Sequence, residues 1–371
     1  MPRGGAHFSS EELVRTLSHY DVGVIHQIKS LSGGNRRAPK MVVVSELGKF
    51  LLKRRPRGKD DLSRVAFAHA VQTHLTENAF PVTTLLATRS DNNTLLQLNS
   101  HIYEFFKFVS GTRYDGSPEA TIDAGRQLAN FHHHLADFAH EFKPLQASFH
   151  DSSTVRTHLR TIGSDRTARP SGNSRLRGND ITPAQAGVQA AEALTILYNE
   201  SSIQANQLGF DSWPQQVIHG DWHPGNMLFS NGKVAVVLDF DSIRVAPAVV
   251  DLANGMLQFS IVGGRPNPAD WPDYCDQDKL LQFLQGYKER AVNDTTLLDE
   301  YKLQALVDLM IETMIAEAVL PIAATGFFGH LHGTDFLLMI RRKAEWLSKN
   351  RDKLTKLISG QGFKSITTKL R

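Results

Sequence analysis

The sequence predicts an α+β chain in which a small antiparallel sheet precedes a larger, mainly helical part. Three observations carry this prediction: a strand-rich segment over residues 22–56, a helical segment over 62–77, and long helical patterns that dominate after residue 111. A chain of 371 residues also exceeds the size at which one hydrophobic core usually stops growing. We therefore expect two domains, over residues 1–109 and 110–371.

The individual elements follow from the spacing of apolar residues and from the turn residues between them. The expected strands are short apolar runs bounded by Gly, Pro, Asn or Ser, and they cover residues 24–31, 41–46, 49–55, 94–98 and 101–109. The expected helices repeat their apolar residues every three to four positions, and they cover residues 62–77, 119–138, 183–200, 278–291 and 299–324.

One segment lacks this patterning. Residues 161–182 are poor in apolar side chains and rich in Arg, Ser, Gly and Asn, which predicts a mobile surface insertion. Its arginines are Arg166, Arg169, Arg175 and Arg177. They could bind an anion, but a solvated loop is the favoured interpretation, since surface charge runs seldom have a specific ligand.

The composition limits the function classes. Forty-one Lys and Arg against 38 Asp and Glu leave a net charge of +3, too small to indicate a nucleic-acid partner. The single cysteine, Cys275, excludes an intramolecular disulfide and a multi-cysteine metal site, and it fits a reducing compartment. Without a signal peptide or a run of about 18 apolar residues, we expect a cytoplasmic protein with no membrane partner. The oligomeric state stays open.

The chemistry is concentrated in one polar run, His-Gly-Asp-Trp-His-Pro-Gly-Asn at residues 219–226, between two apolar runs. Asn231-Gly232 is a strong two-residue hairpin signal, which predicts that residues 233–239 form the returning strand. Counting outward from this turn places Asn226 opposite Val237 and puts Asp239 one diagonal step away on the same face. An amide oxygen and a carboxylate within about 7 Å suit a Mg²⁺ ion that bridges nucleotide phosphates.

The run HGDWHPGN, followed by Val-Val-Leu-Asp-Phe-Asp at 236–241, resembles the catalytic loop and metal motif of the aminoglycoside phosphotransferase and choline kinase-like superfamily. The overall arrangement is most similar to its homoserine kinase-like members. The resemblance implies a bilobal protein kinase-like fold, with a small antiparallel-sheet N-lobe and a mainly helical C-lobe. It also implies transfer of the γ-phosphate of ATP, with Mg²⁺, to a hydroxyl of a small molecule. The acceptor stays open among amino alcohols, amino acids, sugars and aminoglycosides, as does the choice between ATP and GTP.

The resemblance assigns roles to residues of this run. Asp221 matches the catalytic base, Asn226 and Asp239 match the metal ligands, and Asp241 is a supporting candidate. His219 could act as a second base, but a packed histidine that braces the loop is favoured.

On the nucleotide side, Lys53 ends the apolar run Phe-Leu-Leu-Lys and resembles the third-strand lysine that contacts phosphates. The following arginines, Arg54, Arg55 and Arg57, indicate an exposed basic strand end when taken alone. Gly33 and Gly34 could lay backbone N–H groups over phosphates, or could form a plain hairpin turn. Phe106 and Phe108 lie in a segment that resembles the hinge strand, where apolar side chains enclose adenine.

Four further positions complete the predicted site, three of them acidic and one an alanine where an acid is usual. The helix after the lysine strand usually offers a glutamate to the lysine, but Ala68 occupies that place, which leaves the partner of Lys53 open. Asp251 matches an acid that stabilises the catalytic region in these families. Asp308 and Glu312, four residues apart on one helix face, could hold a substrate ammonium, although a solvent-facing pair is favoured.

Two other function classes remain. A nucleotide-binding pseudokinase or a Ser/Thr protein-directed kinase gains weight from the missing helix glutamate. A metallohydrolase could use His219, Asp221 and His223 as ligands, but it would leave Asn226 and Lys53 without a role.

Overall fold

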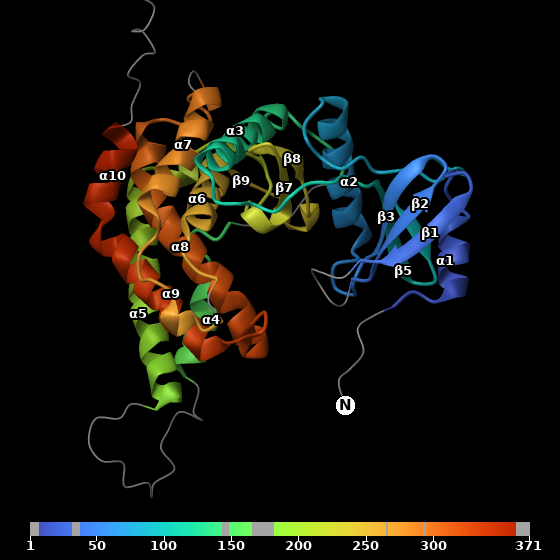
Figure 1. Cartoon of the computed structure of the whole chain (residues 1–371). Coiled ribbons are helices and arrows are strands. Elements are labelled where there is room, and N and C mark those ends of the chain that lie inside the picture. Colours follow the sequence, from blue (N-terminus) through green and yellow to red (C-terminus); the bar gives the residue numbers. More distant parts are fainter. Residues whose placement is uncertain are drawn as a thin grey trace, which may run out of the picture. The chain divides into compact units, whose positions relative to one another are not determined.

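The computed structural model describes residues 7–31, 38–142, 148–164, 182–264, 266–291 and 294–360 (Figure 1). The chain is a mixture of helix and sheet, as the sequence predicts, with a small antiparallel sheet and a mostly helical remainder. Gly33 and Gly34 lie outside the described residues, and so do residues 165–181 of the predicted insertion. Within the described ranges, no helix has the length and apolar character needed to cross a membrane.

The antiparallel sheet has five strands in the order β1-β2-β3-β5-β4. These are β1 (Ile25–Ser30), β2 (Lys40–Ser45), β3 (Gly48–Arg54), β5 (His101–Lys107) and β4 (Leu96–Leu98). Its core side chains include Val43, Leu52 and Phe105, none of which is exposed to solvent. The helix α1 (Ser10–Leu17), which sequence patterning missed, begins with a Ser9–Glu12 capping box. The helix α2 (Leu62–Glu77) has the predicted bounds.

A second hairpin follows the polar run, with β7 (Met227–Ser230) paired to β8 (Lys233–Val237). Its turn residues Asn231 and Gly232 have φ values of 52° and 71°, as a primed hairpin turn requires. Leu228 lies opposite Val236 but Phe229 lies opposite Val234, so β8 carries one extra residue. The predicted pairing of Asn226 with Val237 is therefore wrong by one position: the Leu238 N–H donates to the Asn226 carbonyl at 2.8 Å instead.

The remaining elements are mostly helical. The helices are α3 (Pro118–His134), α4 (Ser153–Gly163), α5 (Pro183–Gln207), α6 (Ala248–Ser260), α7 (Gln277–Ala291), α8 (Glu300–Thr325), α9 (Gly333–Lys349) and α10 (Arg351–Gly360). Two small sheets pair β6 (Gln215–Ile218) with β9 (Arg244–Pro247), and β10 (Phe327–Phe328) with β11 (Leu331–His332). The apolar helix α8 packs against α4, α5, α6, α9 and α10, which explains why most of its side chains are buried.

Contacts divide the chain into two compact units. The first comprises Met1–Asp115, His133–Leu145 and Pro224–Arg244, and the second comprises Gly116–His132, Gln146–His223 and Val245–Arg371. The polar run is therefore shared, because the chain leaves the second unit at His223 and enters the first at Pro224. The boundary near residue 109 stays a prediction.

Candidate active site

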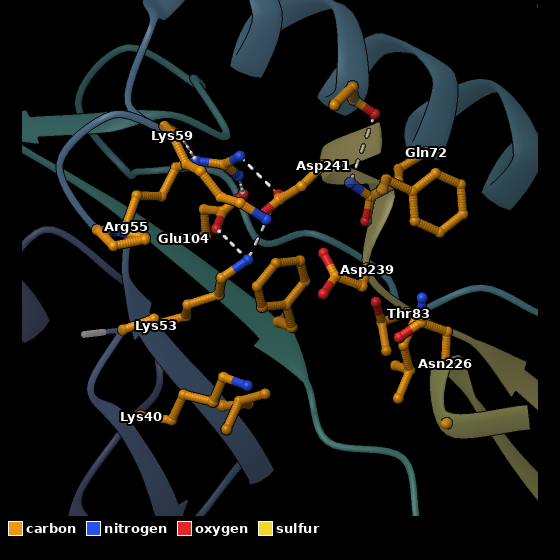
Figure 2. Close-up of a pocket in the computed structure, with 18 residues that line it drawn as sticks. Lys40, Lys53, Arg55, Lys59, Gln72, Thr83, Glu104, Asn226, Asp239 and Asp241 are labelled. Atoms are coloured by element: carbon orange, nitrogen blue, oxygen red, sulfur yellow. Dashed lines mark hydrogen bonds and ion pairs between the residues drawn. The ribbon is translucent and has the colours of Figure 1, made fainter. Parts of the chain in front are cut away.

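The first unit contains a cavity of about 310 Å³, a volume within the range of small-molecule sites (Figure 2). Its walls come from β2, β3, α2, β5 and the segment that begins at Pro224. The lining residues are Ala38, Lys40, Leu51, Lys53, Arg55, Pro56, Lys59, Ala68, Gln72, Thr83, Glu104, Phe106, Gly225, Asn226, Leu238, Asp239, Phe240 and Asp241. The cavity thus brings together five residues for which the sequence predicts a role in the site: Lys53, Phe106, Asn226, Asp239 and Asp241.

Lys53 has a carboxylate partner that sequence reasoning missed. Its Nζ lies 3.2 Å from Glu104 Oε2 and 3.6 Å from Asp241 Oδ1. Lys53 and Glu104 are direct cross-strand partners of β3 and β5, so the strand pairing itself brings them together. Ala68 lines the same cavity. The carboxylate partner of Lys53 is therefore a strand residue, Glu104, and not a residue at the helix position that Ala68 occupies.

The ion pair is charged on both sides. Burial would lower the pKa of Lys53, but Glu104 and Asp241 more than offset it and hold the pKa above its usual value. Burial would likewise raise the pKa of Glu104, but Lys53, His69 and Arg55 hold it well below its usual range. His69 contributes through its Nε2, which lies 3.0 Å from Glu104 Oε1.

Arg55 is buried, so its interpretation as part of an exposed basic strand end is wrong. Its guanidinium donates to Glu104 Oε1 at 2.5 Å and to Asp241 Oδ1 at 2.6 Å, while its Nε donates to the Lys59 carbonyl at 2.7 Å. Lys59 itself is half-exposed and lies 3.5 Å from Asp241 Oδ2. Figure 2 shows these cations converging on the two carboxylates.

Asn226 and Asp239 line the other side of the cavity (Figure 2). Asn226 ends a short 3₁₀ turn (Pro224–Asn226) and is largely buried. Asp239 precedes another 3₁₀ turn (Phe240–Ser242) and has a φ of 61°, a conformation that is uncommon outside glycine and is often kept at functional sites. A carboxylate and an amide oxygen are the ligands that Mg²⁺ prefers, so the residues present fit this ion.

The cavity also holds a second lysine and one of the two predicted aromatic residues. Lys40 of β2 lies opposite Lys53 in the sheet, and burial together with the Lys53 charge holds the pKa of Lys40 below its usual value. Phe106 lines the cavity, whereas Phe108 is not among the lining residues and instead carries the Lys49 ammonium 4.0 Å above its ring.

The second unit holds the first part of the polar run, which is fixed by Asp251 of α6. This buried carboxylate accepts hydrogen bonds from the backbone N–H groups of His219, at 2.6 Å, and Gly220, at 2.8 Å. His132 Nε2 lies 3.3 Å from the same carboxylate. Burial would raise the pKa of Asp251, but hydrogen bonding to His132 and nearby charge hold it below its usual value.

Further contacts fix the loop around Asp221. The Trp222 N–H donates to Asn254 Oδ1 at 3.0 Å, and Asn254 in turn donates to Glu317 of α8 at 2.5 Å. The His219 ring is fully buried and meets the Trp222 ring edge-on, which supports a bracing role for His219. Asp221 is partly exposed, with its Oδ1 3.7 Å from His223 Nε2.

The acids Asp308 and Glu312 of α8 are buried, so their interpretation as a solvent-facing pair is wrong. Glu312 accepts hydrogen bonds from His150 Nδ1 at 2.7 Å and from the Asp151 N–H at 3.2 Å, and it also contacts the Ser202 hydroxyl. Asp308 Oδ1 lies 2.9 Å from the Arg351 guanidinium. Both carboxylates thus hold protein groups, and a role in binding a substrate ammonium stays a prediction.

A metallohydrolase would need several metal ligands grouped in one place. Across the ranges that the structure describes, no three or more His, Cys, Asp or Glu side chains are grouped so that they could hold a metal ion.

Comparisons with known proteins agree with the motif. Residues 27–287 match the model of the phosphotransferase enzyme family. A homoserine kinase from Rhodopseudomonas palustris is 25% identical over 234 residues, which cover 62% of this chain and 63% of that protein.

Many solved structures share the fold. An aminoglycoside phosphotransferase from Alicyclobacillus acidocaldarius superposes with a TM-score of 0.67 at 18% identity, covering 97% of this chain and 99% of the other. An amicoumacin kinase in complex with AMP-PNP, Ca²⁺ and Ami superposes with a TM-score of 0.60 at 12% identity, covering 94% of each chain. The expected kinase-like fold is therefore confirmed, and the family match spans well over half of the sequence. The chain belongs to the phosphotransferase enzyme family.

Proposed function

We propose that the protein transfers the γ-phosphate of ATP to a hydroxyl group of a small molecule. The observation that carries this proposal is the cavity of the first unit, which gathers Lys53, Asn226 and Asp239. Phosphoryl transfer needs a cation for the phosphates and oxygen ligands for a divalent metal, and this cavity offers both kinds of group.

Different residues of the cavity would bind the phosphates, the metal and the nucleobase of the nucleotide. Lys53, with Lys40 beside it, would contact phosphate oxygens, and Asn226 and Asp239 would hold Mg²⁺. When bound, the metal neutralises negative charge on the transferring phosphoryl group. Phe106 and Leu51 provide apolar surface for a nucleobase. The amicoumacin kinase complex, which contains AMP-PNP and Ca²⁺, supports nucleotide and metal binding in this fold.

Asp221 would orient the acceptor hydroxyl and accept its proton, as its match to the catalytic-base position implies. Such a group acts mainly through placement, so the loop that carries it has to be rigid. The hydrogen bonds of Asp251 to His219 and Gly220, and of Asn254 to Trp222, meet this requirement.

The acceptor is proposed to be a small hydroxyl compound that carries an amine. This class is suggested by the relatives, a homoserine kinase and an aminoglycoside phosphotransferase. Glu104 also removes the main support for a pseudokinase or a protein-directed kinase, because Lys53 has its carboxylate partner after all. ATP as the donor and a cytoplasmic location stay predictions.

A screen of amino alcohols, amino acids, sugars and aminoglycosides for ADP release would test the proposal and identify the acceptor. With the acceptor found, Asp221→Asn should abolish ADP release while leaving the affinity for Mg·ATP within about twofold, because it removes the proton acceptor alone. Asp211→Asn, at an exposed position of the same unit, is the control and should remain active. Unchanged turnover in Asp221→Asn would refute the assignment of the base, and a silent screen despite tight Mg·ATP binding would favour a pseudokinase.

A further inference from the structure

We propose that Glu104 and Arg55 are positioning residues that together free and aim Lys53 for the nucleotide phosphates, in place of the helix glutamate that this chain lacks. The inference rests on the proposed function and deepens it, because it concerns the same cavity. It is built on groups of the first unit alone.

Glu104 is placed for this role by the sheet. It lies directly across from Lys53 in the β3–β5 pairing, it is 1% exposed, and its Oε2 lies 3.2 Å from the Lys53 ammonium. Its other oxygen, Oε1, is held by Arg55 at 2.5 Å and by His69 at 3.0 Å. One oxygen of the carboxylate is thus fixed by the protein and the other faces the lysine.

Arg55 provides the second half of the arrangement. Asp241 lies 3.6 Å from Lys53 and attracts it, and this attraction would be stronger if Arg55 did not compete for the same carboxylate. Arg55 binds Asp241 more closely, at 2.6 Å, and its own Nε is anchored on the Lys59 carbonyl. The charge of Asp241 is therefore neutralised by a group that stays in place, and Lys53 can exchange its longer contact with Asp241 for a phosphate.

The neighbouring arginine offers an internal comparison. Successive side chains of a strand point to opposite faces, so Arg54 points away from Lys53. Its guanidinium binds Glu12 of α1 at 2.6 Å, and it does not line the cavity. A loss of positive charge at residue 54 should therefore leave the nucleotide site unchanged.

The test compares two ligands that share the base but differ in phosphates. In Glu104→Gln, the affinity for Mg·ATP measured by calorimetry should fall about 10- to 100-fold, because a charge-assisted contact that aims Lys53 is lost. The affinity for adenosine, measured by ligand-observed NMR, should change less than about threefold, since adenosine has no phosphate. Arg54→Gln, the control, should bind both ligands as the unchanged protein does. Damage to the cavity as a whole would weaken both ligands alike.

Because Glu104 is buried, its replacement could prevent folding, and Arg55→Lys is the second variant. Lysine keeps one positive charge but lacks the fork that binds two carboxylates, so the same loss selective for ATP is expected. Equal weakening of ATP and adenosine, or unchanged ATP binding in either folded variant, would overturn the inference. If the unchanged protein binds neither ligand, the proposed function fails before the roles of Glu104 and Arg55 are tested.

Discussion

Replacing Asp251 with alanine tests whether a single buried carboxylate holds the loop that begins at His219. The substitution removes the acceptor of two backbone N–H groups, on His219 and Gly220, and both of these residues are buried. A buried donor left without an acceptor costs about 1–3 kcal/mol, so the two together cost about 2–6 kcal/mol. Most domains are stable by only about 5–15 kcal/mol. Asp251→Ala should therefore remove a large part of the free energy of unfolding of the second unit.

Unfolding of the second unit can be followed by itself. All four tryptophans, Trp213, Trp222, Trp271 and Trp346, lie in its sequence ranges, so intrinsic tryptophan fluorescence follows its unfolding by urea. We expect a lower midpoint with an unchanged slope, since the surface exposed on unfolding stays the same. Asp211→Ala, an exposed acid of the same unit, is the control and should stay within about 0.5 kcal/mol. A midpoint for Asp251→Ala that equals this control would refute the reasoning.

Two further predictions concern stability in the second unit. Gly286→Ala should lower the unfolding free energy by about 1–3 kcal/mol or more, because a Cβ there would overlap the backbone oxygen of Ile122 where α3 and α7 meet. The control is Gly163→Ala, which should be neutral because a Cβ at residue 163 would make only ordinary contacts. Equal urea midpoints for the two variants would contradict this close packing. Burial raises the pKa of Asp308 from 3.8 to about 6, so the folded state binds a proton that the unfolded state has released. The unfolding free energy should therefore fall as the pH rises from about 3.8 to about 6. In Asp308→Asn, the unfolding free energy measured by urea titration should no longer fall over this pH range. If it still falls, another group is responsible for the pH dependence.

The parts of the structure that could be predicted are those specified by neighbouring residues. The hairpin turn at Asn231-Gly232, the helix Leu62–Glu77 and the strands around Lys53 all follow from local spacing and turn chemistry. The bulge at residue 235 cannot be predicted in this way, because the run Lys-Val-Ala-Val-Val at residues 233–237 contains no residue that would mark a bulge. Asn226 and Asp239 nevertheless line one cavity, because both flank the same hairpin.

Local sequence does not predict the surroundings of residues whose partners are distant in the chain. Glu104 is a lone acid in the apolar segment 101–108, and such a position is a signal for a buried ion pair, but its partner depends on the β3–β5 pairing. The sequence favours an exposed Arg55 because this residue stands among other arginines. It cannot mark Glu312 as buried, because acids four residues apart occur on solvated and buried helix faces alike and its partner His150 is 162 positions away.

Each of the two units contains a buried, charged carboxylate, and the two carboxylates have different roles. In each, a buried carboxylate is kept charged by histidine and by other groups: Glu104 by Lys53, His69 and Arg55, and Asp251 by His132 and two backbone N–H groups. Glu104 directs one oxygen to a lysine that can still exchange partners, whereas both oxygens of Asp251 are committed to the protein itself. A change at Glu104 should therefore lower both stability and phosphate-dependent binding, because Arg55 and His69 lose their acceptor and Lys53 loses its partner, whereas a change at Asp251 should be seen mainly in stability. Measuring both quantities in both variants would separate a carboxylate that positions a ligand-binding group from one that holds a loop.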